Sequence, residues 1–158
     1  MKNLKQIIQA GLLVGTLDIL AAFIQFFLAT NKEPSPVLKF IASGVFGPDA
    51  FRGGMEMIVA GLILHYIIAL GFTFLFFMIY PILPGAIKNN ILLGICYGIF
   101  IWCVMKFAVV PLSNTPPQSF SFSGAAIAIS ILIVCIGIPL AVIARRSLGT
   151  IRNIGEDN

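Results

Sequence analysis

Residues 12–27 read LLVGTLDILAAFIQFF, an almost continuous apolar run with one acidic residue, Asp18, near its centre. Apolar residues continue on both sides, so the run from Ile7 to Ala29 covers 23 residues. At a rise of about 1.5 Å per residue, a helix of this length crosses a hydrocarbon core of about 30 Å. The stretch therefore predicts a membrane-spanning helix, and it raises the question of what holds a carboxylate inside it.

The whole chain has the composition of a membrane protein. Of its 158 residues, 59% are hydrophobic and 10% are charged, and the mean hydropathy is +1.03. Soluble domains carry about a quarter charged residues. The net charge of +4 comes from basic residues spread thinly over the chain ends and loops. We interpret them as topology signals and expect no nucleic-acid partner.

Three further apolar runs predict three more spans, at about 55–80, 90–112 and 122–144. The second run ends at YPILPG, the third ends before the proline-rich PLSNTPPQ, and the fourth ends at Arg145 and Arg146. The first run begins like a signal peptide, but no small-x-small cleavage site follows it, so we expect it to be retained. The predicted fold is an all-α four-transmembrane-helix bundle, a single integral membrane domain over 1–158.

The distribution of basic residues predicts the orientation of the chain. Six lysines and arginines lie on one side, in the N-terminal tail, the loop 81–89 and the C-terminal tail, and three lie on the other side, in the loop 30–54. Positive residues are retained in the cytoplasm, so we expect both termini to be cytoplasmic.

The long loop 30–54 contains PSPVLKFIASGVFGPDAFRGG at residues 34–54. Ser35 as N-cap, Pro36 at the first helical position and Gly44 as a stop predict a short helix over about 36–43. Its apolar run is too short to span a membrane. We favour an outer interfacial helix over a re-entrant one, because Lys39 can reach outward while neighbouring apolar side chains stay in lipid.

Small residues on each span predict the packed faces. In the first span, small and polar residues recur at steps of three and four and form one seam: Gly11, Gly15, Asp18, Ala22, Gln25 and Ala29. The corresponding residues of the other spans are Gly61 in the second, Gly94 and Gly98 in the third, and Gly124 in the fourth. Such residues allow helix backbones to approach closely. Pro139 is expected to kink the fourth span.

Four ionisable residues fall inside the predicted spans, where charge is costly and marks candidate sites. Asp18 and His65 lie at matched depth on antiparallel spans, so we predict that they approach within direct or one-water hydrogen-bonding reach. The pair either exchanges a proton or only fixes helix register. Glu56 and Lys106 lie toward the outer boundary, where Lys106 reaches the interface or meets Glu56, with Arg52 as a competitor for that carboxylate.

No pattern in the chain indicates an enzyme, a metal site or a cofactor. The three cysteines lie in apolar runs without a C-x-x-C motif, and haem ligation by the single histidine would need a partner subunit. The phenylalanine-rich run at 72–80 is more typical of a lipid-facing surface than of a quinone site. We therefore expect no catalytic residues, no cofactor and no metal.

Several segments together resemble a known group of proteins: GTLDI at 15–19, IASGVFG at 41–47, LHYIIA at 64–69 and YGIFIWCVMKFAVVPLS at 97–113. In order and spacing they resemble small four-helix bacterial inner-membrane proteins, including YagU-like proteins, over about residues 11–145. The resemblance implies four membrane helices and an inner-membrane location. It implies no activity and no catalytic residues.

Two functions remain open. One is a non-enzymatic accessory protein that binds lipids and either a second copy of the chain or another membrane protein through its small-residue faces. The other is an oligomeric transport or permeation protein that uses Asp18 and His65. Four helices with few polar residues favour the accessory role. Access of water to Asp18 separates the two functions. If Asp18 and His65 bond to each other without water, the accessory role is favoured, and if they line a hydrated cavity, transport is favoured.

The predicted orientation is testable by thiol labelling. In a cysteine-free background, single cysteines at Asn3 or Asn158 should react only with reagents that enter the cytoplasm, whereas one at Asn114 should react from outside. Labelling at Asn158 by an impermeant reagent in intact cells contradicts the orientation.

Overall fold

The computed structural model describes residues 4–82, 89–117 and 120–146, and all regular structure in these residues is helical. Four helices are long and apolar enough to cross a membrane: α1 (Leu4–Thr30), α3 (Met55–Ile79), Asn90–Leu112 and Phe122–Arg146. Each end lies within three residues of the predicted boundary, so the predicted fold class is confirmed. Part of the YPILPG turn and the basic residues Lys2, Lys88 and Arg152 lie outside the described residues.

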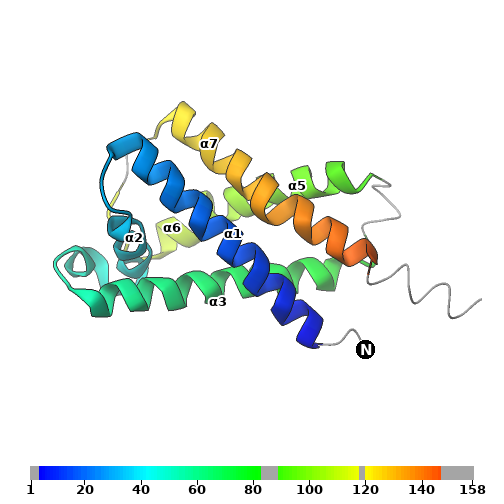
Figure 1. Ribbon diagram of the computed structural model, residues 1–158, viewed down its shortest axis with the longest axis horizontal. Helices are drawn as coiled ribbons and strands as arrows, with labels where there is room; N and C mark the ends of the chain where they lie inside the picture. Colours follow the sequence, from blue (N-terminus) through cyan, green and yellow to red (C-terminus); the bar gives the residue numbers. More distant parts are fainter. Residues whose placement is uncertain (1–3, 83–88, 118–119, 147–158) are drawn as a thin grey trace, which may run out of the picture.

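The four spans form an elongated bundle with two distinct ends (Figure 1). The described ends of α1 and of the fourth span, at Leu4 and Arg146, lie at one end, which we call the terminus end. At the other end lie the short helix α2 (Ser35–Phe46) and the 3₁₀ helix η1 (Gly47–Phe51), which we call the α2 end.

The third and fourth spans each contain a widened, π-helical turn next to a proline. The third consists of α5 (Asn90–Val104), η2 (Met105–Val109) and α6 (Val110–Leu112), and the fourth begins as α7 (Phe122–Leu132) and η3 (Ile133–Gly137). Pro111 and Pro139 follow η2 and η3 by two residues and cannot donate to the preceding turn. The wider turns satisfy the backbone instead. The distortion predicted at Pro139 thus takes the form of a π-helical turn, in which the N–H of Ile138 bonds to the carbonyl of Ile133.

The closest approach of two spans is the crossing of α5 and η3 (Figure 1). A Cβ atom added to Gly137 would collide with the carbonyl oxygen of Gly94, and one added to Gly94 would lie 2.7 Å from the backbone nitrogen of Ile138. At Gly98 the obstruction is the backbone of Ile133, at 2.7 Å. The two backbones are in direct contact, and only glycine allows it.

Gly94 and Gly98 are predicted packing residues, whereas Gly137, their partner in the fourth span, was not predicted. The other predicted packing glycines divide into two groups. Gly11 and Gly15 are buried against α3, and Gly61 lies against the backbone of Leu38 in α2. Gly124 differs from the prediction, because it is exposed and a Cβ added there would meet only Ser121, in the turn that begins its own helix. The first turns of α7 diverge from their neighbours, so a small residue there has no helix to meet.

Helix α2 is longer than predicted and is bounded differently. Its N-cap is Pro34, Ser35 makes no capping hydrogen bond, and the helix continues past Gly44 to Phe46. The stop is Gly47, whose φ of 64° is unfavourable for other residues. Gly44 serves a different purpose: its carbonyl accepts a hydrogen bond from the backbone N–H of Asn114 at 3.0 Å, which joins α2 to the connection before α7.

The buried core lies in the terminus half of the bundle. Its members come from the first half of α1, the end of α3, α5 and the end of the fourth span, and they include Val14, Phe76, Tyr97 and Leu140. In contrast, no residue of α7 is buried. The bundle is therefore tightly packed at the terminus end, whereas at the α2 end α2 packs closely against α3 and α7 does not pack closely against its neighbours.

We expect Gly137→Ala to destabilise the protein, because its methyl group would push α5 and η3 apart at their closest contact. Overpacking of this kind costs about 1–3 kcal/mol, and the loss should appear as a lower midpoint of thermal unfolding in detergent. Gly71→Ala is the matched control, since an added Cβ there meets nothing within 4 Å. Equal midpoints for the two variants contradict the crossing.

Candidate functional site

A cavity of about 220 Å³ lies beside the buried core, and the core residues Ile101 and Ile136 form part of its wall. Its wall includes Asp18 and His65, near the middle of their helices, Ser113 and Thr115 at the α2 end, and Phe72, two turns past His65 toward the terminus end. The rest of the wall is almost entirely apolar and comes from α2, α3, both π-helical turns and α5. The apolar lining residues include Phe40, Ile41, Phe72, Ile101, Met105, Val109 and Ile136.

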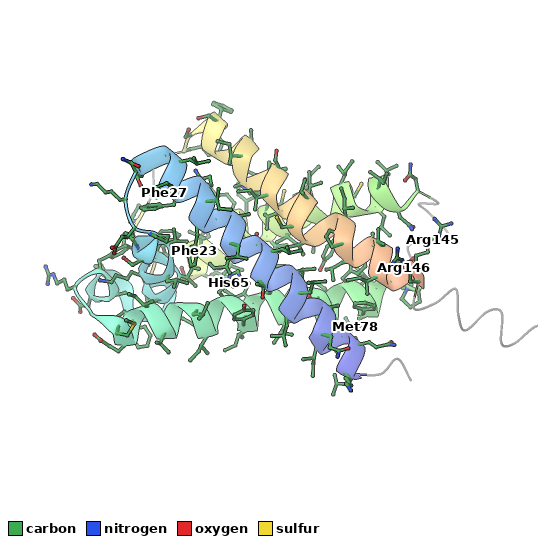
Figure 2. The ribbon with its side chains drawn as sticks, in the orientation of Figure 1. Phe23, Phe27, His65, Met78, Arg145 and Arg146 are labelled. Carbon is green, nitrogen blue, oxygen red and sulfur yellow. The ribbon has the colours of Figure 1, made fainter. Side chains whose placement is uncertain are left out.

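His65 is buried where α3 passes α1, near the middle of the bundle (Figure 2). Its Nε2 atom lies 2.8 Å from the carbonyl oxygen of Gly15. A carbonyl oxygen only accepts, so Nε2 carries the hydrogen and donates it. The close approach depends on Gly15, because a Cβ there would lie 3.0 Å from Ala69, one turn beyond His65. The other ring nitrogen, Nδ1, has no hydrogen-bond partner among the described residues.

Asp18 lies one turn after Gly15 on α1, and its side chain is half-buried. It interacts electrostatically with His65, but no described residue donates a hydrogen bond to its carboxylate. The direct hydrogen bond, one of the two predicted arrangements, is not formed, and Nε2 of His65 bonds to the backbone of α1 instead. A contact through one water stays a prediction. The positions of Asp18 and His65 in the sequence place both residues at the same depth, but they do not determine which group the His65 ring bonds to.

Both unpartnered groups face the cavity. Every buried side-chain nitrogen or oxygen atom in the described residues has a hydrogen-bond partner. The carboxylate of Asp18 and the Nδ1 atom of His65 have none, so they are not sealed in the protein interior, and both residues line the cavity. An ionised carboxylate at mid-membrane costs about 2.5–3.5 kcal/mol on insertion-based scales. The cavity therefore has a polar inner end that needs water, a proton or a bound group.

Two residues next to this pair hold it in place, and neither was identified from the sequence. The hydroxyl of Thr16 lies 2.8 Å from that of Tyr66 and donates to the carbonyl of Leu12 at 2.7 Å. The Tyr66 hydroxyl therefore donates to Thr16. This bond joins α1 to α3 one residue away from the contact between Gly15 and His65. A hydroxyl residue beside each of those two residues was the signal available in the sequence.

The α2 end of the cavity is lined by hydroxyl groups of the PLSNTPPQ segment, which also went unrecognised. The hydroxyls of Ser113 and Thr115 lie 2.6 Å apart, and Ser113 donates to the carbonyl of Val110 at 2.8 Å. Asn114 fixes the segment to α2 through a 3.0 Å bond from its Nδ2 atom to the carbonyl of Val45. A proline-rich segment is usually interpreted as a connection between helices, so its contribution to the cavity wall was not predicted from the sequence.

Glu56 and Lys106 are not brought together. Glu56 accepts a 2.6 Å hydrogen bond from the N–H of Gly54, and Arg52, the expected competitor, lies 3.8 Å from Asp49. The ammonium of Lys106 lies 5.7 Å from the centre of the Phe120 ring. It lines a separate cleft between α1 and α7, together with Gln25 and Ser121.

The small-and-polar seam on α1 follows its predicted course for most of its length. Gly11 and Gly15 are buried, Asp18, Ala22 and Gln25 are half-buried, and Ala29 is exposed. The seam opens toward the α2 end, where α1 and α7 diverge and enclose an apolar hollow.

Fold and site together define a multi-pass helical membrane protein with a polar-ended internal cavity. In the described part of the chain, no group of three or more histidine, cysteine, aspartate or glutamate residues could hold a metal ion. Comparisons with protein-family models, curated proteins and solved structures give no match for the chain.

The state of His65 is directly measurable, because the chain has one histidine. In ¹⁵N NMR spectra of the protein in lipid, at a pH where the imidazole is neutral, we expect Nε2 to have the protonated type of shift. Nδ1 should have the unprotonated type. The opposite tautomer contradicts the hydrogen bond to Gly15.

Proposed function

We propose that this chain is a non-enzymatic protein of the bacterial inner membrane, with both termini in the cytoplasm, that admits a small solute to Asp18 and His65 in transport or permeation. In this orientation the α2 end faces outward, together with the part of the cavity that Ser113 and Thr115 line. The location and orientation rest on the basic residues and on the resemblance to YagU-like proteins.

The observation that carries the proposal is the Asp18 carboxylate, which has no hydrogen-bond donor among the described residues and lies at the inner end of a cavity. The polar group of a residue that only fixes helix register forms its hydrogen bonds within the protein, as the Thr73 hydroxyl does by donating to the carbonyl of Ala69. An acidic group left open to a cavity at mid-membrane is typical of ion and substrate pathways.

The packing suggests one-sided access in a single copy of the chain. Beyond Asp18, the terminus half is filled by buried side chains such as Phe76 and Leu140, both with no exposed surface. A solute that enters from the α2 end therefore stops at mid-membrane. Passage requires the helices to separate at the terminus end.

An accessory role is the second candidate, and a separate observation favours it. None of the residues of α7 is buried, and Ile127 and Ile131 border an apolar hollow beside α1. A partner helix or a second copy of the chain could cover that face. In this case the cavity has no role in transport, and water does not reach Asp18.

Water access to position 18 distinguishes the two candidates. In a cysteine-free background, we expect Asp18→Cys to react with a small cationic methanethiosulfonate added from outside, because thiol modification needs a water-exposed thiolate. Leu20→Cys is the matched control, since Leu20 lies on the exposed face of α1, which contacts lipid, at nearly the same depth.

We expect modification at position 18 to be at least tenfold faster than at position 20. Equal, slow modification of both cysteines contradicts the transport proposal and leaves the accessory role.

A further inference from the structure

The hydrogen bonds around the cavity determine the kind of ligand that it can take. The hydrogen on Nε2 of His65 is donated to Gly15, and that of the Ser113 hydroxyl is donated to Val110. The Thr115 hydroxyl is left to donate to Ser113, 2.6 Å away. The side-chain donors of these three residues on the cavity wall are thus used within the protein.

The groups that remain free are acceptors. The Asp18 carboxylate accepts at both oxygens when ionised, and Nδ1 of a neutral, Nε2-protonated histidine accepts as well. A ligand that complements them must donate hydrogen bonds and carry positive charge. An anion would meet a carboxylate without any free donor, and a hard metal ion would lack the six or more oxygen ligands that it prefers.

The rest of the wall limits the ligand's shape. Phe40 and Phe72 supply aromatic rings, and aliphatic side chains supply most of the remaining surface. Aromatic faces attract organic cations, and apolar walls favour a hydrocarbon body. A cavity of about 150 Å³ holds benzene, so the 220 Å³ cavity has room for one ring and a short aminoalkyl chain.

We propose that the cavity binds a primary amine in its protonated form, with the ammonium beside Asp18 and His65 and the apolar body toward Phe40 and Phe72. This assignment names the solute class of the proposed function and rests on it. Neither a hard metal ion nor an anionic metabolite fits the same set of groups.

Three ligands of nearly equal shape test the charge requirement without any mutation. They are 2-phenylethylamine, propylbenzene and 3-phenylpropionate, titrated at pH 7 into the full-length protein in lipid nanodiscs, with empty nanodiscs as the blank. We expect the amine to bind at least tenfold more tightly than the hydrocarbon, and the carboxylate not to bind. Equal affinities for amine and hydrocarbon overturn the proposal.

Asp18→Asn tests the residue. It should weaken amine binding at least tenfold and leave propylbenzene binding unchanged, whereas Asp49→Asn, at an exposed position in η1, should change neither. Unchanged amine affinity in Asp18→Asn overturns the proposal. In Gly44→Leu, the new side chain would fill the α2 end of the cavity, so the binding of both the amine and propylbenzene should weaken. Undiminished binding in this variant would mean that the ligand binds elsewhere, and it also overturns the proposal.

The two proposals fail in different ways. If Asp18→Cys is labelled from outside but the amine binds no better than propylbenzene, the cavity is open and only the ligand class is wrong. If Asp18→Cys is not labelled and none of the three ligands binds, the proposed function itself is wrong.

Discussion

The structure depends on one contact, the crossing of α5 and η3 at Gly94 and Gly137, where two backbones touch without side chains between them. In lipid, helices gain little from burying apolar surface, so close van der Waals contact has to hold them together. This crossing fixes the terminus half, and the buried core lies around it. The α2 half has no crossing of this kind between α7 and its neighbours. The apolar hollow between α1 and α7 occupies the space that results.

The placement of Asp18 follows from the same geometry. Gly15 brings α3 close enough for His65 to bond to the backbone of α1, and Asp18 lies one turn further on, where the helices begin to separate. A carboxylate deeper in the tight half would need a donor from the protein. Asp18 lies at the boundary of the tightly packed half and faces a cavity instead. Whatever occupies the cavity therefore helps to offset the cost of the charged carboxylate.

Sequence reasoning located the spans and most of the close contacts, because both depend on local properties: length, hydropathy and the absence of a side chain. It also placed Asp18 and His65 at one depth, since depth follows from counting residues. The partner of the histidine ring depends on helix rotation and on the competing carbonyl of Gly15, which counting does not reveal. Similarly, Gly44 and Gly47 are both plausible stops for α2, and the choice depends on the bond between Asn114 and Gly44. The cavity was not predictable, because it depends on how side chains of α2, α3 and the third and fourth spans pack around Asp18 and His65.

The depth of Asp18 has an electrical consequence. Moving one elementary charge across the whole membrane against a potential of 100 mV involves about 2.3 kcal/mol. Asp18 lies near the middle of α1, so a monovalent cation that reaches it from the outer face crosses about half of the field, or about 1 kcal/mol per 100 mV. In the proposed location and orientation, the membrane potential is negative inside and draws the cation inward. An energised cell of that kind would therefore bind the cation several times more tightly than a de-energised one, with no change in the protein.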